Sequence, residues 1–217
     1  MNIEQARFNM VEQQIRPWNV LDLGVLELLS VVKREAFVPA AYQALAFADL
    51  EIPLGHGQCM LAPRLEARLL QDLALQPHET VLEIGAGSGY MAALMAHRAH
   101  RVVSLEIVPE LATMARNNLR AAGIQNAEVR QADGAASTAA EGNYDVIVLS
   151  GSVTEVPQSL LNLLKVGGRL AGIVGDEPAM CATLVTRTSA TAFTTRQPWD
   201  CNAPRLQGFA EPSRFQF

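Results

Sequence analysis

The regular alternation of short apolar runs with helical stretches after Pro77 most constrains how this chain folds. The apolar runs resemble buried strands and cover five segments: Thr80–Ile84, Arg101–Glu106, Ala127–Gln131, Tyr144–Leu149 and Arg169–Val174. The helical stretches between them cover three segments: Ser88–Arg98, Pro109–Ala122 and Val156–Leu164. Strands that alternate with helices predict a mainly parallel sheet covered on both faces, which is the doubly wound α/β class.

The first 76 residues show a different, mostly helical pattern. Apolar residues at helical spacing predict helices over Ile3–Arg16 and Leu21–Val32, and another helix that begins near Pro63. Leu50–Pro63 has little periodicity and is expected to be a loop. We therefore expect an N-terminal helical region at 1–76 and a core at 77–217, which together form one compact unit. Within the core, Thr191–Arg196 and Leu206–Phe217 are expected to add antiparallel edge strands.

The glycine loop after the first core strand is the most informative motif. The strand Val81–Ile84 leads into Gly-Ala-Gly-Ser-Gly and then directly into a helix. Glycine allows a sharp turn and lets a ligand approach the backbone. The amides at the start of the helix then favour an anionic group such as a carboxylate. The loop therefore predicts a ligand site formed by Gly85, Ala86, Gly87 and Gly89.

Acidic residues occur at three successive strand ends. Glu83 precedes the loop, Glu106 lies 23 positions later and is followed by Ile107, and the pair Asp133-Gly134 follows the third strand. A carboxylate at the position of Glu106 can accept hydrogen bonds from ribose hydroxyls, and Asp133 can accept one from an adenine amino group. This pattern predicts a nucleoside without phosphates, and S-adenosylmethionine (SAM) is such a ligand. The alternative is a glycine turn beside ordinary strand-end carboxylates.

An NAD-dependent enzyme is the rival nucleotide-binding interpretation. Such an enzyme would be expected to carry the spacing GxGxxG near its N-terminus and a second mononucleotide-binding half. This chain has the spacing GxGxG after 84 residues, and no second half is evident. The sequence therefore favours methyl transfer over hydride transfer.

Charge and composition narrow the remaining classes. The formal net charge is -5, which argues against a broad basic surface for nucleic acid. Cys59, Cys181 and Cys201 are widely spaced and form no metal-binding motif, so we expect inert thiols and no metal site. The N-terminus is polar, and no apolar stretch approaches the ~18 residues of a membrane span. We expect a cytoplasmic protein that does not bind a membrane.

Several segments together resemble the protein-L-isoaspartate O-methyltransferase family of class I SAM-dependent methyltransferases. The resemblance runs from about Arg7 to about Gly175. It rests on MVEQQI, VLELLSVVKREAFVP, IPLGHGQ, LEIGAGSGY, VVSLEIVPELATMARNNL and YDVIVLSGSVTEVPQSLLNLLKVGGRL, in that order. The resemblance implies a Rossmann-like fold, SAM as the cofactor, and methylation of isoaspartyl side carboxylates in damaged proteins. It also implies a protein or peptide as the partner.

The loop that follows GHGQ departs from the family pattern. The family usually continues with Thr-Ile-Ser, whereas this chain has Cys59-Met60-Leu61. The hydroxyl that the family places beside the acceptor carboxylate therefore falls on Leu61, which cannot form a hydrogen bond. The resemblance implies an acceptor loop that includes His56, Gln58, Cys59 and Leu61. His56 either orients the acceptor or holds the loop.

Ser150 and Ser152 end the fourth core strand, where they either face the acceptor or form a polar turn. Three functions fit these observations: isoaspartyl methylation, methyl transfer to another acceptor, and SAM binding without catalysis. We expect the first, because a carboxylate of pKa ~4 is already ionised at neutral pH and needs no catalytic base.

Overall fold

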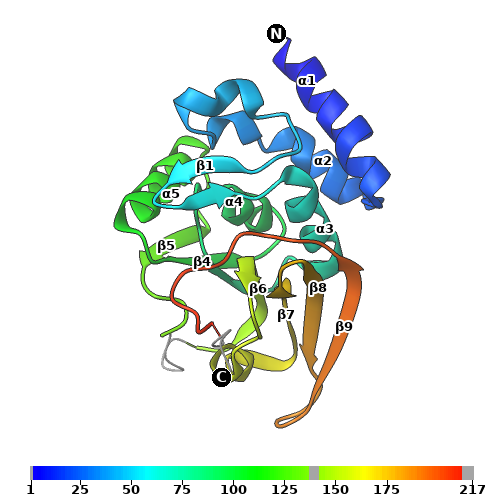
Figure 1. Cartoon of the computed structure of the whole chain (residues 1–217), viewed down its shortest axis with the longest axis vertical. Helices are drawn as coiled ribbons and strands as arrows, with labels where there is room; N and C mark the ends of the chain where they lie inside the picture. Colours follow the sequence, from blue (N-terminus) through cyan, green and yellow to red (C-terminus); the bar gives the residue numbers. More distant parts are fainter. Residues whose placement is uncertain (1, 137–141, 212–217) are drawn as a thin grey trace.

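A seven-stranded, mainly parallel sheet forms the centre of the molecule (Figure 1). The computed structural model describes residues 2–136 and 142–211. The strands follow in this order across the sheet: β5 (Ala127–Gln131), β4 (Arg101–Glu106), β3 (Thr80–Ile84), β6 (Tyr144–Val153), β7 (Leu164–Asp176), β8 (Ala179–Arg187) and β9 (Phe193–Asp200). The first five are parallel, and β8 and β9 are antiparallel to their neighbours. This order confirms the predicted α/β class.

The chain reverses its direction of winding between β3 and β6. From β3 it proceeds to β4 and β5 on one side, and from β6 to β7 on the other. Ligands of doubly wound sheets bind at such a switch point, outside the carboxyl ends of the strands. The glycine loop after β3 lies at this point.

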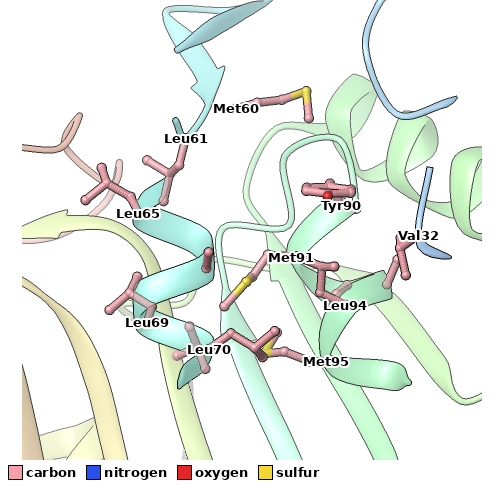
Figure 2. Close-up of a cluster of buried hydrophobic side chains, with 14 of the residues drawn as sticks. Val32, Met60, Leu61, Leu65, Leu69, Leu70, Tyr90, Met91, Leu94 and Met95 are labelled. Carbon is pink, nitrogen blue, oxygen red and sulfur yellow. The ribbon is translucent and has the colours of Figure 1, made fainter. Parts of the chain in front are cut away.

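The two faces of the sheet carry separate apolar cores, because the central strands are buried on both sides. On one face, α3 (Pro63–Leu73), α4 (Tyr90–Ala96) and α5 (Pro109–Ala121) contribute to the larger core. On the other face, α6 (Gln158–Asn162) contributes Leu160 and Leu161 to the smaller one. Figure 2 shows the contact of α3 with α4, in which Leu70 faces Met91 and Met95, whereas Leu69 points to the other side of α3. The helical periodicity predicted for these segments reflects their burial.

The N-terminal region is helical, as expected, but its helices are interrupted. The predicted helix over Ile3–Arg16 consists of α1 (Ile3–Asn9), the π-helix η1 (Met10–Ile15) and the start of the 3₁₀ turn η2 (Arg16–Trp18). After α2 (Leu23–Val31), the short 3₁₀ helices η3 (Arg34–Ala36) and η4 (Ala40–Leu45) lead to the acceptor loop. No helix in the described part of the chain is long and apolar enough to cross a membrane.

The prediction of an irregular loop over Leu50–Pro63 was wrong. β1 (Ile52–Gly55) and β2 (Gln58–Met60) form an antiparallel hairpin. His56 and Gly57, at the turn, have φ angles of 55° and 71°. Positive φ at both central residues matches the right-handed twist of the flanking strands. A hairpin of three to four residues per strand is too short to show a clear sequence period.

The C-terminal prediction was partly wrong. β9 covers the expected edge strand at Thr191–Arg196, but β8 was not predicted. Residues 206–211 form no strand, and residues 212–217 lie outside the described part of the chain. Instead, the segment Ala203–Phe209, which we call the strap, crosses the carboxyl edge of the sheet (Figure 1). A hydrogen bond from the Leu206 amide to the Ser152 carbonyl (2.9 Å) ties the strap to β6.

Candidate functional site

The glycine loop has the geometry that its sequence predicts. Gly85, Gly87 and Gly89 have φ angles of 90°, 52° and 85°, a region that disfavours residues with a Cβ. A Cβ on Gly89 would lie 3.2 Å from the Ala115 backbone, so this glycine also lets α4 approach α5 closely. The loop therefore turns sharply at the carboxyl end of β3.

Glu106, at the end of β4, lies directly against the glycine loop. The Gly87 amide donates to Glu106 Oε2 (2.8 Å), and the Val108 amide donates to Oε1 (3.0 Å). These bonds fix the carboxylate at the edge of a small cavity that Ile107, Gly134 and Gln58 also line. The structure thus brings together residues from the ends of β3, β4 and β5.

Glu83 is fully buried at the end of β3 and faces the opposite side of the loop. The Ser150 hydroxyl donates to Glu83 Oε1 (2.7 Å), and the Ser104 hydroxyl donates to Oε2. Burial raises the pKa of Glu83 to about 8, although both hydroxyl hydrogen bonds act to lower it. This carboxyl group is therefore largely protonated at neutral pH when no cation is nearby.

Asp133 lies after β5, at the far end of the strap. The Ala135 amide donates to Asp133 Oδ1 (2.9 Å), which orients the carboxylate. The strap approaches so closely that a Cβ on Gly208 would lie 2.6 Å from Asp133 Oδ1. The strap therefore extends along the three predicted strand ends.

Leu206 of the strap divides the site into two small cavities. Its side chain packs on Gly85 and Gly151, where added Cβ atoms would lie 2.7 Å and 2.9 Å from it. One cavity lies beside Glu106 and the other beside Glu83, and each measures about 20 Å³. Each has room for about one water molecule, whereas pockets for larger ligands measure several hundred Å³. A ligand of nucleoside size therefore requires Leu206 to move.

The acceptor loop presents an apolar residue at position 61, where the resemblance predicted the loss of a hydroxyl. Leu61 is 5% exposed and continues the apolar stripe of α3 beside Leu65 (Figure 2). Cys59 lines the cavity beside Glu83, and burial together with Glu51 raises the pKa of its thiol to about 12. The thiol is therefore protonated and a poor nucleophile at neutral pH.

His56 and Gln58 occupy different environments. The His56 side chain is about half exposed, and its Nε2 lies 4.0 Å from Glu110 Oε2 on α5. The His56 carbonyl accepts a hydrogen bond from Gln207 Nε2 (3.2 Å), so this residue links the hairpin to the strap. Gln58 lines the cavity beside Glu106. These positions favour a loop-holding role for His56.

The two serines at the end of β6 also differ. Ser150 lines the cavity beside Glu83. Ser152 is fully buried, and its hydroxyl donates to the Ala203 carbonyl (2.7 Å). Ser152 therefore anchors the strap, and of the two only Ser150 borders a cavity.

A buried ion pair behind the acceptor loop was missed by the sequence analysis. Arg34 Nη1 lies 2.5 Å from Glu66 Oε2, Arg34 Nη2 donates to the Leu61 carbonyl (2.8 Å), and the guanidinium stacks on Tyr90. A signal existed, because Glu66 lies four residues before Leu70 and seven before Leu73 on the apolar face of α3. A charged residue on such a face requires a partner.

Cavity volume alone does not locate the site. A cavity of about 410 Å³ lies between α5 and β5, and Arg116, Gly123 and Glu128 are among the residues that line it. It lies away from the glycine loop and from the switch point of the sheet. The convergence of strand ends, rather than volume, identifies the candidate site.

The sequence matches the family model "Protein-L-isoaspartate(D-aspartate) O-methyltransferase (PCMT)" over residues 5–200. A protein-L-isoaspartate O-methyltransferase from Rhodopseudomonas palustris is 43% identical over 184 residues, which cover 84% of this chain and 75% of that protein. Another from Methanoculleus marisnigri is 41% identical over 181 residues, which cover 83% and 81% of the two chains. The strap lies beyond the matched residues of the family model.

Solved structures share the fold. A beta-aspartate methyltransferase from Plasmodium falciparum, in complex with S-adenosyl-L-homocysteine, aligns with a TM-score of 0.81. The alignment covers 95% of this chain and 99% of that chain at 20% identity. Because the family model spans most of the chain and curated relatives exceed 40% identity, the chain belongs to the protein-L-isoaspartate O-methyltransferase family.

Proposed function

We propose that this protein transfers a methyl group from SAM to the free side carboxylate of isoaspartyl residues in proteins. The observation that carries the proposal is the convergence of Glu83, Glu106 and Gly134 on the cavities beside one glycine loop in a chain of this family. Acidic side chains beside glycine-loop amides suit a nucleoside ligand that has no phosphates and carries a positive charge.

The residues present suit the chemical groups of SAM. We propose that Glu106, fixed by the Gly87 amide, accepts from the ribose hydroxyls, and that Asp133, fixed by the Ala135 amide, accepts from the adenine amino group. The cavity beside Glu83 would take the methionine end, with the glycine-loop amides near its carboxylate. Displacement of Leu206 would join the two cavities across Gly85.

The proposed chemistry needs little acid–base help from the protein. SAM supplies an electrophilic methyl group when it is bound. The acceptor carboxylate is ionised at neutral pH, because its ordinary pKa is ~4. The chain's own residues contribute alignment and exclusion of water, and alignment of two reactants can lower a barrier by ~7–11 kcal/mol. No residue is therefore assigned the role of a catalytic base.

The acceptor end offers few hydrogen-bond donors. Leu61 is apolar and buried, so it can pack against an acceptor but cannot donate a hydrogen bond to it. Ser150 and the amide group of Gln58 are among the neutral donors that border the two cavities closest to the acceptor loop. We propose that these two side chains orient the acceptor and that Leu61 weakens its binding.

The first experiment is a methyl-transfer assay with SAM and a short isoaspartyl peptide beside its normal aspartyl twin. We expect base-labile methyl ester on the isoaspartyl peptide alone. Binding of SAM without any ester would overturn the isoaspartyl assignment. In that case, labelled SAM added to a cell extract would reveal whether another acceptor takes the methyl group.

The family implies a protein or peptide as the partner of this chain. We propose that the acceptor is an exposed segment that can enter the space between the hairpin and the strap. We also propose a cytoplasmic location, where labelled protein should fractionate with the soluble content of the cell. Recovery in a membrane or extracellular fraction would contradict this proposal.

A further inference from the structure

Two buried carboxyl groups line the cavity between the acceptor loop and the glycine loop. These are Glu83 and Glu66, which are 0% and 4% exposed. Arg34, which is also 0% exposed, pairs with Glu66. The three side chains therefore hold one negative charge in excess when all three are ionised.

The surrounding groups do not cancel this excess charge. Among the described residues, Arg34 acts on Glu66, whereas the charged groups that act on Glu83 are Glu66 and Glu106, which are both acidic. The Cys59 thiol is neutral because its pKa is raised to about 12. Burial also raises the pKa of Tyr90, so its hydroxyl is neutral. More distant Arg7 is engaged by Glu4 and Glu35.

An uncompensated buried charge is unfavourable, so the carboxyl groups hold a proton when no cation is present. Burial raises the pKa of Glu66 to about 7 and that of Glu83 to about 8, with Arg34 opposing the shift at Glu66. Tyr90 lines the same cavity, and its buried hydroxyl has no hydrogen-bond partner in the described part of the chain. An unpartnered polar group of this kind indicates that the cavity is shaped for a polar ligand.

Resting on the proposed function, we infer that Glu66 and Glu83 distinguish the cationic donor SAM from its neutral product S-adenosylhomocysteine (SAH). The excess negative charge of this carboxyl pair attracts the sulfonium, and the proton held by the pair leaves to solvent when SAM binds. After methyl transfer the sulfonium has become a neutral thioether, whereas the α-ammonium that both ligands carry is unchanged, so the pair takes a proton back and the product loses the attraction to the sulfonium. Glu66 thereby becomes a specificity-determining residue that favours donor binding and product release.

The affinity for SAM should depend on pH in one direction only. The proton and the sulfonium compete for the same negative charge, and by linkage each weakens the binding of the other. SAM affinity should therefore rise with pH, by at most about tenfold per pH unit for one proton, and level off once the pair is ionised. SAH carries no sulfonium, so its affinity should change little over the same range.

The test is calorimetric titration of the whole chain with SAM and with SAH between pH 6 and pH 9. Two buffers of different ionisation enthalpy report the number of protons released. We expect the ratio of SAM to SAH affinity to rise about tenfold across this range. We also expect SAM, but not SAH, to release a proton near pH 7. A ratio that stays constant, or equal proton release by both ligands, would overturn the inference.

Two variants test the charge count itself. Glu66→Gln leaves Arg34 and Glu83 as a balanced pair, so the affinity ratio should fall and lose its pH dependence. Arg34→Met combined with Glu66→Gln leaves Glu83 unbalanced again, so the preference for SAM should return. A purely structural role of Glu66 predicts no such return. The wild-type pH dependence tests the inference even when one of these variants fails to fold.

Asp133→Asn is the matched control, because both ligands carry the same adenine. It should weaken SAM and SAH equally and leave their ratio unchanged. Failure of SAM to bind the wild type would overturn the proposed function together with this inference. Methylation of the isoaspartyl peptide with a constant affinity ratio would overturn this inference alone.

Discussion

The two ends of the candidate site are built in different ways. At the cofactor end, Glu83, Glu106 and Asp133 are at or just after the ends of adjacent parallel strands, whose register is set by the sheet. At the acceptor end, the hairpin (residues 52–60) and the strap meet through contacts such as that of Gln207 Nε2 with the His56 carbonyl. A strand ladder positions the first set, whereas side-chain contacts between distant segments position the second.

This difference bears on how readily each end can change. The family model matches residues 5–200, which include the glycine loop and the strand-end carboxylates but not the strap. A side chain at a strand end is constrained by many backbone hydrogen bonds. A loop residue can change with fewer consequences for the fold. We therefore expect substitutions in the hairpin and the strap to be tolerated better than substitutions at the strand ends.

The largest expected effect is on the buried ion pair behind the acceptor loop. Arg34→Ala leaves Glu66 buried without its partner and should lower the free energy of unfolding by ~3–5 kcal/mol. Urea unfolding measures this loss. The control Arg101→Ala removes a half-exposed pair with Glu128 and should cost less than ~1 kcal/mol. Equal losses of unfolding free energy in the two variants would show that burial of the Arg34–Glu66 pair does not add to its effect on stability.

The next effect concerns the cofactor end. Glu106→Ala removes the acceptor proposed for ribose and leaves the Gly87 and Val108 amides without their partner. Hydrogen bonds to charged groups contribute ~1.5–3 kcal/mol, so calorimetry should show SAM binding weakened by about 100-fold. Glu110→Ala, an exposed change on the first turn of α5, should leave it unchanged. Similar affinities in the two variants would remove Glu106 from the site.

A smaller effect is expected from restoring the hydroxyl of the family pattern. Leu61→Ser supplies a donor for the acceptor carboxylate and should lower the KM for an isoaspartyl peptide by about tenfold, with SAM affinity unchanged. Leu61→Ala opens a similar cavity without a hydroxyl and should not show this gain. If the two variants behave alike, Leu61 does not lie at the acceptor.

The smallest effect is expected at Cys59. Its thiol has a pKa raised to about 12 by burial and by Glu51, so it is not a nucleophile at neutral pH. Cys59→Ser should change the rate of methyl transfer by less than about twofold, as measured with the isoaspartyl peptide. A large loss of activity would instead assign this thiol a direct role in the reaction.

The elements that could be predicted from sequence are those with a long or distinctive local pattern. The five parallel strands, the glycine loop and helices α3 to α5 agree with their predicted positions. The short hairpin, β8 and the strap did not appear in the prediction. Strands of three or four residues carry too few positions for a period, and an irregular strap carries none.

The sequence by itself determines the doubly wound sheet and the position of its glycine loop, because both depend on local periodicity and on residues close together in the chain. Only the tertiary structure decides the charge balance of the site. Arg34 and Glu66 are 32 positions apart, and Glu83 and Ser150 are 67 positions apart. Burial turns these distant residues into one electrostatic unit, because a charge removed from water interacts strongly with the nearest buried charge.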